Sequence, residues 1–355
     1  MIVSPSHTGS HPSIFSMKPL AILLLAMASL VGCSKAPESS NPDAASKEAA
    51  PATSAAPLMI GYSDWPGWVA WQVAIDKGWL KEAGVDVKFE WFDYAASLDA
   101  FKGGQLDAVL ATNGDNLVNS ASGSRGIMIM MTDYSNGNDM IIGAPNINSL
   151  ADLKGKTVAV EQGLVEHLML SHALRKSGMS INDVTLQNAP TNEMPQILAS
   201  KSVAAVGAWQ PIAGQTLKAV SGSKPLYTSA DEPGLIYDVL AVSPTSLGQR
   251  RADWIKVVQV WDKVVSYIND PATQPDALKI MAARAGVTPE EYAAFLGGTR
   301  LMTLAENQAA MDKNDSLQSL YGSSYYVNQF NVDNQVYSQL VDVDSLIDPK
   351  LVSGQ

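Results

Sequence analysis

The sequence predicts an α/β protein in which two lobes enclose a ligand cleft. Short apolar runs typical of strands alternate along the chain with runs of helical spacing, which is the pattern of a doubly wound sheet. This alternation occurs once up to about residue 143 and again beyond it. The chain has 355 residues, of which 46% are hydrophobic, so it is long enough for each of two lobes to bury a core.

The first half of the pattern starts with a strand over 58–62 and a turn rich in Pro and Gly. A helix over 68–81 follows, and Gly84 ends it. We expect Trp71 and Trp79 of this helix to lie in the core. The other elements of this half are a strand over 85–92, a helix over 95–102, and strands over 106–111, 127–131 and 140–143.

The second half contains the clearest unit, at 149–176. Ser149 is a good N-cap for one turn over 150–153, and Gly155 ends that turn. A buried strand over 157–160 then leads through a tight turn into a helix over 164–176. The further elements are a strand over 184–187, a helix over 193–201, a strand over 203–208 with a helix after Pro211, an extended segment at Tyr227, a strand over 237–242, and helices over 254–269, 276–285, 289–296 and 304–313.

Several motifs resemble those of a known family. Ser-Leu-Ala-Asp-Leu-Lys-Gly-Lys at 149–156, followed by a short strand, resembles the start of the second lobe in substrate-binding proteins of ABC importers. The closest branch is the SsuA/THI5-like one, which includes binders of nitrate, sulfonates, taurine and thiamine precursors. Matching stretches are Gly61-Tyr62 with Trp65 and Trp68, the run from Gly103 to Ala108, and Trp209-Gln210-Pro211.

This resemblance extends over roughly 57–310 and implies the two-lobed periplasmic-binding-protein fold, type II, with an ABC permease and ATPase as partners. We expect residues 58–143 and 241–345 to form lobe 1 and residues 144–240 to form lobe 2. The two crossovers between the lobes are then expected near Gly143 and Ala241.

The N-terminal segment indicates export. Its apolar run over 20–31 is too short to span a bilayer and has the length of a signal-peptide core. Leu-Val-Gly-Cys at 30–33 resembles a lipobox, so we expect 1–32 to be a lipoprotein signal peptide and Cys33 to carry the lipid. An ordinary secretory signal is the alternative. An Ala-, Ser- and Pro-rich tether over 33–57 would then hold the protein at the periplasmic face of the cell envelope.

The charge pattern narrows the ligand class. The net charge of −11 argues against a nucleic-acid partner. The loops expected to line the cleft carry acids but neither Lys nor Arg, whereas a buried anion requires a counter-charge. We therefore expect a nitrogen-rich or cationic ligand, guanidine-like or aminopyrimidine-like, ahead of taurine or another sulfonate, with nitrate third. The predicted ligand-binding residues are Asp64, Trp65, Asn113, Asp115, Tyr134, Asp139, Glu161, Trp209 and Asp238.

Some of these residues also have structural interpretations that the sequence leaves open. Trp65 and Trp209 follow strands, where loop residues either bind ligand or pack. Asp64 fits a helix cap, and either Asp133 or Asp139 could close the turn at Asn136-Gly137. Glu166 fits the start of a helix, where its charge is favourable. The histidines at 167 and 172 are spaced for neither a shared metal nor a catalytic triad.

An enzyme is the weaker prediction. The same fold occurs in a pyrimidine synthase of thiamine biosynthesis, but its cysteine-rich motif is absent, because Cys33 is the only cysteine. The sequence contains no Gly-rich phosphate loop, serine nucleophile elbow or cluster of metal ligands. We therefore expect no catalytic residue, cofactor or metal. A sensor that docks on a membrane receptor is an alternative of another class, since it needs only lobe closure.

Overall fold

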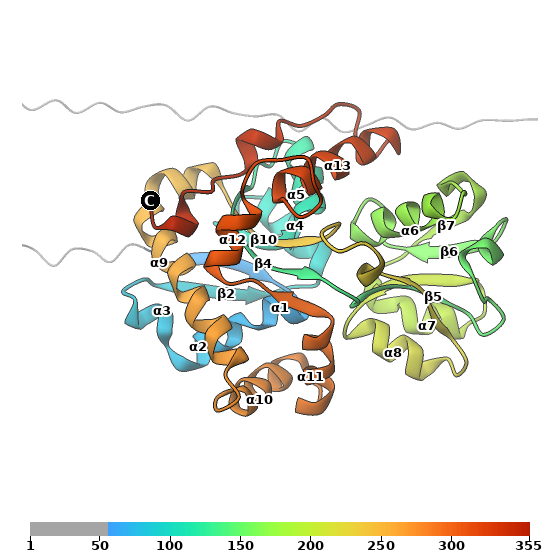
Figure 1. Cartoon of the computed structure of the whole chain (residues 1–355), viewed down its shortest axis with the longest axis horizontal. Helices are drawn as coiled ribbons and strands as arrows, with labels where there is room; N and C mark the ends of the chain where they lie inside the picture. Colours follow the sequence, from blue (N-terminus) through green and yellow to red (C-terminus); the bar gives the residue numbers. More distant parts are fainter. Residues whose placement is uncertain (1–55) are drawn as a thin grey trace, which may run out of the picture. The chain divides into compact units, whose positions relative to one another are not determined.

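Two separate sheets organise residues 56–355, the part of the chain that the computed structural model describes (Figure 1). The first sheet has six strands in the order β11-β4-β10-β3-β1-β2, and the second has five in the order β7-β6-β8-β5-β9. We call each sheet with its helices the first and the second lobe. The predicted two-lobed α/β fold is confirmed. The predicted signal peptide and lipidation site at Cys33 lie outside the described residues.

The first sheet mixes parallel and antiparallel strands. Strand β1 runs parallel to β2 and β3, whereas β10 is antiparallel to β3 and β4. In the second sheet β6 runs parallel to β7 and β8, and β5 is antiparallel to β8 and β9. The strands are β1 (Leu58–Tyr62), β2 (Val87–Trp91), β3 (Ala108–Thr112), β4 (Ile127–Ser135), β5 (Asp139–Gly143), β6 (Thr157–Val160), β7 (Thr185–Asn188), β8 (Ala205–Trp209), β9 (Lys224–Thr228), β10 (Tyr237–Val242) and β11 (Thr299–Leu301).

Both crossovers between the sheets lie a few residues before the expected positions. The strand that we assigned to the end of lobe 1, β5, pairs with β8 and β9 and belongs to the second sheet. Strand β10 already pairs with β3 and β4 of the first sheet from Tyr237 onward. Apolar alternation identifies a strand but not the sheet that it joins. At the first crossover, Asn138 Nδ2 donates to Phe295 O at 2.6 Å and to Thr299 Oγ1 at 2.7 Å.

Most predicted helices are present, with boundaries set by the expected caps. The predicted N-cap at Ser149 is confirmed and forms a capping box, Thr288 forms another before the helix that starts at Pro289, and Gly155 has the left-handed φ of 70° that ends its turn. The helices are α1 (Pro66–Val69), α2 (Trp71–Lys77), α3 (Trp79–Glu82), α4 (Tyr94–Lys102), α5 (Asn113–Ala121), α6 (Val165–Lys176), α7 (Met194–Ala199), α8 (Ile212–Ala219), α9 (Pro244–Asn269), α10 (Gln274–Ala285), α11 (Pro289–Gly297), α12 (Leu304–Ala310) and α13 (Leu320–Asp333).

Four helical regions differ from the prediction. Helix α9 begins at Pro244, ten residues before the expected start at 254. The helix expected over 68–81 is divided into α1, α2 and α3, and Gly78 takes a left-handed φ of 70° between the last two. Helix α5 was not predicted, because Asn-Gly-Asp-Asn at 113–116 is typical of a turn. The Thr112 hydroxyl nevertheless caps this helix by accepting from the backbone N–H of Asp115. Helix α13 was also missed, since its buried face is rich in Ser and Asn.

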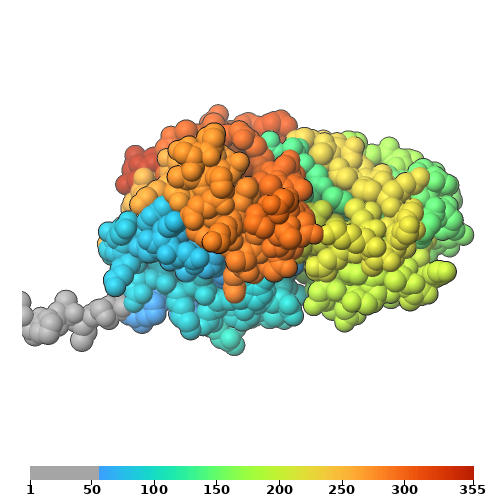
Figure 2. All heavy atoms as spheres, turned by 90° about the horizontal axis from the view of Figure 1, so that it is seen from below, coloured from blue at the N-terminus to red at the C-terminus, as the bar shows by residue number. Residues whose placement is uncertain are grey.

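The two lobes have adjoining hydrophobic cores. Trp71 is fully buried against Trp261, with ring centroids 4.9 Å apart, and Trp79 is 8% exposed, so both predicted core tryptophans are confirmed. A smaller apolar cluster fills the space between the second sheet and helices α7 and α8. In Figure 2 the elements of the first lobe (blue, cyan and orange) and those of the second (green and yellow) meet along a seam. Within 56–355, no helix combines the length and the apolar character that crossing a membrane requires.

Candidate ligand-binding site

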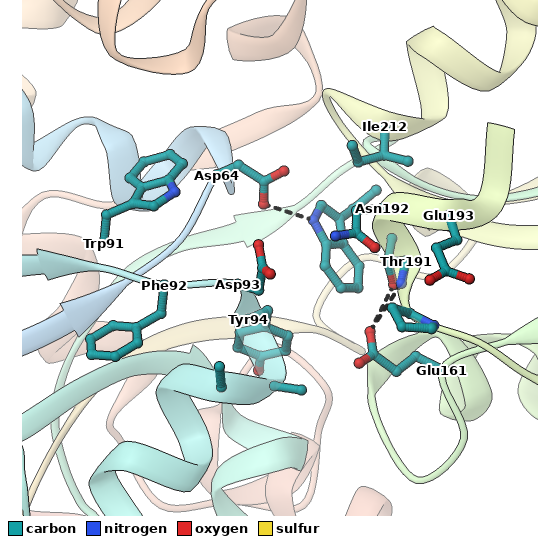
Figure 3. A pocket seen from close by; sticks show the side chains of 14 residues that line it. Asp64, Trp91, Phe92, Asp93, Tyr94, Glu161, Thr191, Asn192, Glu193 and Ile212 are labelled. Carbon is teal, nitrogen blue, oxygen red and sulfur yellow. Dashed lines mark hydrogen bonds between the residues drawn. The ribbon is translucent and has the colours of Figure 1, made fainter. Parts of the chain in front are cut away.

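A pocket of about 420 Å³ lies where loops of the two lobes face each other (Figure 3). We call it the outer pocket. Four of its lining residues are acidic, and none is Lys, Arg or His. The first lobe contributes Asp64, Trp91, Phe92, Asp93, Tyr94, Ala95 and Ala96, and the second contributes Glu161, Pro190, Thr191, Asn192, Glu193, Trp209 and Ile212.

Strand ends bring these residues together. Asp64 comes two residues after β1, and Tyr94 begins α4 shortly after β2. In the second lobe Glu161 directly follows β6, and Trp209 is the last residue of β8. Ligands of open α/β sheets bind outside the carboxyl ends of the strands, and here two such edges face one another.

Hydrogen bonds hold two of the pocket's carboxylates in place. Trp209 Nε1 donates to Asp64 Oδ1 at 3.3 Å, from the second lobe to the first (Figure 3). The Thr191 hydroxyl donates to Glu161 Oε2 at 3.0 Å, and the Thr191 backbone N–H donates to the same oxygen at 3.3 Å. Burial raises the pKa of Asp64 to about 6 and also raises the pKa of Glu161.

A second, much smaller cavity shares Tyr94 and Trp209 with the outer pocket. Its volume of about 10 Å³ is close to what one water molecule needs. We call it the inner cavity. It is lined by Trp65, Trp68, Tyr94, Thr112, Asp139, Val165, Trp209, Ile236 and Asp238.

Four of these lining residues form a continuous chain of aromatic rings. The ring centroids are 6.5 Å apart for Trp65 and Trp68, 5.1 Å for Trp68 and Tyr94, and 5.6 Å for Tyr94 and Trp209. Aromatic faces attract cations and stack on planar ligands. The chain begins in the first lobe and ends in the second, so a molecule in the inner cavity would contact both.

Five carboxyl groups lie in and around the inner cavity, each at most 3% exposed: Asp115, Asp133, Asp139, Glu166 and Asp238. Within 56–355, the ion pairs of the structure involve none of them. Burial raises the pKa of Asp115 and of Asp133 to about 7 and that of Asp139 to about 6. It raises the pKa of Glu166 and of Asp238 further, well above their ordinary values.

Four of the five acids form two carboxyl–carboxyl pairs, one in each lobe. In the first lobe Asp133 and Asp238 are register partners on β4 and β10 and share a side-chain hydrogen bond. In the second lobe Asp139 of β5 and Glu166 of α6 share another. Two carboxyl groups can form such a bond only if one of them carries a proton.

Donor groups stabilise two of the first-lobe acids. Asp133 accepts from Trp65 Nε1 at 2.9 Å and from the Thr132 hydroxyl at 2.8 Å. The Tyr94 hydroxyl donates to Asp115 Oδ2 at 2.7 Å. Both acids are therefore fixed by the walls of the inner cavity.

Within 56–355, one buried polar atom of the cavity's lining residues has no partner at all. Trp68 Nε1 finds no hydrogen-bond acceptor among the described residues, and such an atom costs about 1–3 kcal/mol when left unsatisfied. The Asp139 and Asp238 carboxyl groups line the same cavity, and in the described part of the chain each has only the other acid of its pair as a partner for Oδ2. A ligand that donates N–H groups to the two acids and accepts from the indole would complement all three residues. In residues 56–355, no group of three or more His, Cys, Asp or Glu side chains is arranged to hold a metal ion.

The structure brings six of the nine predicted site residues to the two cavities. Asp64, Glu161 and Trp209 line the outer pocket, and Trp65, Asp139, Asp238 and again Trp209 line the inner cavity. A seventh, Asp115, lines neither cavity but contacts Tyr94, which lines both. These residues come from loops and strand ends far apart in the sequence, as the predicted fold requires.

Asn113 and Tyr134 line neither cavity. Asn113 is the first residue of the unpredicted helix α5, and its amide bonds Ser323 and Ser324 of α13 and the Tyr237 backbone N–H. Tyr134 lies within β4, which extends four residues beyond the predicted strand, and it packs on Tyr237 with ring centroids 6.0 Å apart. Both residues were expected in loops that line the cleft, and this expectation was wrong, because Asn113 lies in a helix and Tyr134 in a strand.

Sequence reasoning missed other residues of the site. Tyr94 was overlooked although it follows a strand, which is the same signal that identified Trp209. Asp133 and Glu166 were interpreted as turn and helix-terminus residues. The signal that could have identified them is a single acid inside an otherwise apolar segment, at the end of 127–133 and near the start of 164–170.

Comparisons with known proteins agree with this geometry. A family model described as NMT1/THI5 like matches residues 65–274. A curated binding protein of Brucella abortus (strain 2308) is 28% identical over 177 residues, which are 49% of this chain and 54% of that protein. The chain thus matches only about half the length of this curated relative.

Solved structures share the fold. The alkanesulfonate-binding protein SsuA of Xanthomonas axonopodis pv. citri, bound to MOPS, has a TM-score of 0.70 at 18% identity, covering 83% of this chain and 98% of its own. The nitrate-binding protein NrtA of Synechocystis PCC 6803 has a TM-score of 0.67 at 13% identity, covering 84% and 87%. The desulfurization enzyme DSZB has a TM-score of 0.61 at 16% identity, covering 84% and 97%.

Proposed function

The chain belongs to the NMT1/THI5-like family, and from this membership we propose that it is the substrate-binding protein of an ABC importer. It captures a small nitrogen-rich or cationic solute between its lobes and delivers it to a permease. The fold that it shares with SsuA and NrtA supports the role of a binding protein. The shared fold does not identify the ligand, which we infer from the residues of the site.

One observation carries the ligand class: two buried acids, Asp139 and Asp238, line a cavity walled by aromatic rings, and no Lys, Arg or His of residues 56–355 lines it. Hydrogen bonds that involve a charged group contribute about 1.5–3 kcal/mol each. A face-on Trp ring adds about 0.5–2 kcal/mol for a cation. Two such bonds and stacking on Trp68 could supply much of the roughly −8 kcal/mol of a micromolar complex.

The unpaired N–H of Trp68 narrows the class further. A guanidinium group has donors only, so it would leave Trp68 Nε1 unsatisfied. The edge of an aminopyrimidine presents an amino donor beside a ring nitrogen that accepts. An aminopyrimidine-like ligand therefore fits the unpaired atoms better than a guanidine-like one.

Anionic ligands fit the site poorly. Neither cavity is lined by Lys, Arg or His, and both are lined by acids. Burying a sulfonate or nitrate beside carboxylates without a counter-charge would cost several kcal/mol. Binding of a sulfonate or nitrate, the ligands of the structural relatives, would therefore contradict the ligand class that we propose.

Binding would be coupled to movement of the lobes. The inner cavity has room for about one water molecule, so an aminopyrimidine would enter with the lobes apart and the lobes would then close around it on a wider cavity. Asp139 and Trp209 belong to the second lobe, whereas Asp238, Trp68 and Tyr94 belong to the first. A ligand that contacts both sets binds the closed state more tightly than the open state, and it shifts the population accordingly. The closed surface would then be recognised by the permease, or by a receptor if the protein is a sensor.

We also propose that lipid attached to Cys33 anchors the protein at the periplasmic face of the cell envelope, and that it binds its solute without converting it. DSZB, an enzyme with the same fold, makes turnover worth measuring. Release of product from a bound candidate ligand by the pure protein would overturn the binding-only role. Incorporation of labelled palmitate by the wild-type chain but not by Cys33→Ser would support the anchor.

The experiment that tests the ligand class is a thermal-shift series with guanidinium, 4-aminopyrimidine, simple amines, taurine, alkanesulfonates and nitrate. A ligand at 100 times its Kd adds about 2.7 kcal/mol to the free energy of unfolding. We expect 4-aminopyrimidine to give the largest shift. A shift with sulfonates or nitrate alone would keep the importer role and overturn the cationic ligand.

A further inference from the structure

Glu166 is a buried acid that lines neither cavity. It lies in the first turn of α6 and is 0% exposed. Neither of its carboxyl oxygens meets an N–H or neutral O–H donor among the described residues. Its side-chain partner is the carboxyl of Asp139, which does line the inner cavity. The two acids therefore share a proton.

The surroundings indicate which of the two acids keeps that proton. The titratable groups that act on Glu166 are Asp139 of β5, Asp115 of α5 and Glu161 after β6, and all of them are acids. Asp139 is the better place for the negative charge, because it lines the inner cavity and is 3% exposed, whereas Glu166 is fully buried and lines neither cavity. In agreement, burial raises the pKa of Glu166 well above its ordinary value but that of Asp139 only to about 6.

A glycine on the neighbouring strand leaves room for the Glu166 side chain. Gly207 of β8 faces it, and a Cβ atom at position 207 would lie 3.0 Å from both Glu166 Cβ and Glu166 Oε2. Any larger residue at 207 would push against the Glu166 side chain. The absence of a side chain at this strand position leaves room for the Glu166 side chain beside β8.

We propose that Glu166 is a positioning residue that remains protonated and donates its hydroxyl to Asp139, so that Asp139 is ionised and held toward the ligand. The part of this inference that concerns the ligand rests on the proposed function. Glu166 itself does not touch the ligand. A carboxyl used in this way supplies a donor where Lys or Arg would neutralise the charge that a cationic ligand requires.

Infrared spectroscopy tests the protonation state without any ligand. We expect the difference spectrum between the wild-type protein and Glu166→Gln at pH 8 to contain the C=O band of a protonated carboxyl group. The exposed acid Glu290 of α11 provides the matched control, because Glu290→Gln should change only carboxylate bands. A wild-type minus Glu166→Gln spectrum with carboxylate bands alone would overturn the proposal.

The pH profile of binding tests the positioning role, with 4-aminopyrimidine as the probe. Glu166→Gln keeps a donor and should hold affinity within about threefold of wild type. Glu166→Leu removes the donor, so Asp139 should become protonated at a higher pH than in the wild type. Since a protonated Asp139 binds the probe less well, the loss of affinity should be at least tenfold greater at pH 6 than at pH 8. A loss of equal size at both pH values would indicate packing only. A tenfold loss in Glu166→Gln at pH 8 would indicate an ionised Glu166; either result overturns the proposal.

The two proposals fail separately. If wild-type protein binds neither 4-aminopyrimidine nor guanidinium, the ligand class is wrong, while the infrared experiment still decides whether Glu166 is protonated. If these probes bind but the infrared band is absent, the ligand class stands and the role of Glu166 is overturned. If Glu166→Leu fails to fold, Gly207→Ala can replace it, because the added methyl group displaces the same carboxyl. In Gly207→Ala the affinity for 4-aminopyrimidine should then be lost at a higher pH than in the wild type.

Discussion

The indole N–H of Trp209 in the second lobe donates a hydrogen bond of 3.3 Å to Asp64 Oδ1 in the first. The Trp209 ring also meets Tyr94 edge-on, with centroids 5.6 Å apart, and these two aromatic residues line both the outer pocket and the inner cavity. The two side chains therefore lie between the outer pocket and the inner cavity. The hydrogen bond from Trp209 to Asp64 therefore connects the lobes at the entrance to the inner cavity.

Replacing the donor of this hydrogen bond should speed ligand release. Trp209→Phe keeps an aromatic ring but removes the N–H, and a hydrogen bond to a charged group contributes about 1.5–3 kcal/mol. We expect the dissociation rate of 4-aminopyrimidine, measured by stopped-flow fluorescence, to rise about tenfold. Trp79→Phe, a core substitution remote from both cavities, is the control. An unchanged dissociation rate in Trp209→Phe would show that the hydrogen bond does not hold the lobes closed.

The unpaired indole of Trp68 should distinguish two kinds of ligand. Trp68→Phe removes the only unsatisfied donor of the inner-cavity lining within 56–355. We expect isothermal titration to give a five- to tenfold weaker affinity for 4-aminopyrimidine, which can accept from this N–H. The affinity for guanidinium, which cannot accept, should change less than twofold.

Trp71 offers a matched control for this experiment. Its indole N–H is also buried and unpaired, but it lies in the core of the first lobe and lines neither cavity. Trp71→Phe should therefore leave both affinities unchanged. An equal loss of both ligands in Trp68→Phe would mean that Trp68 acts only through the packing of its ring.

The buried acids should make the ligand-free protein less stable as the pH rises. Burial raises the pKa of Asp115 and Asp133 to about 7 and that of Asp64 and Asp139 to about 6, from an ordinary 3.8. Between about pH 4 and pH 7 the folded state therefore binds more protons than the unfolded state. Its free energy of unfolding falls by about 1.4 kcal/mol per pH unit for each such proton.

Urea denaturation of the ligand-free protein at pH 5 and at pH 8 would measure this effect. The stability is present in full below about pH 4 for these groups and is lost as the pH passes 6 to 7. The exposed Asp152 and the half-buried Asp183 have a pKa lowered by backbone hydrogen bonds, so they act oppositely, but only in the acid range. Greater stability at pH 8 than at pH 5 would contradict raised pKa values for the buried acids.

The fold was more predictable from sequence than the site was. Ser149, Gly155 and Thr288 determine local structure through capping and turn geometry, so their elements were found at the right residues. Asn113 misled the prediction because Asn-Gly favours a turn in isolation, whereas the Thr112 cap and packing on α13 stabilise a helix. At that position tertiary contacts override the local preference of Asn-Gly for a turn.

The site depended on pairings that a single sequence does not show. Asp139 and Asp238 were predicted as ligand-binding acids because they lie in or beside loops expected to line the cleft. Their partners did not follow, because Glu166 reaches Asp139 across α6 and β5, and Asp133 reaches Asp238 through the register of β4 and β10. A lone acid in an apolar segment indicates a candidate site residue, but its role cannot be assigned until its neighbour in space is known.

Asp139 should illustrate a conflict between stability and binding. In the ligand-free protein its charge at pH 8 is buried, and a pKa of about 6 against an ordinary 3.8 indicates an unfavourable contribution to folding. Asp139→Asn removes that charge and should raise the free energy of unfolding at pH 8 by about 1–3 kcal/mol. The same change removes an acceptor that a cationic ligand needs, so affinity for 4-aminopyrimidine should fall at least tenfold. Denaturation and titration of one preparation would measure both quantities, with Glu290→Gln as the control. A variant that lost affinity without gaining stability would mean that Asp139 is not ionised in the ligand-free protein, and the charge that attracts the ligand would then have to reside on Asp133 or Asp115.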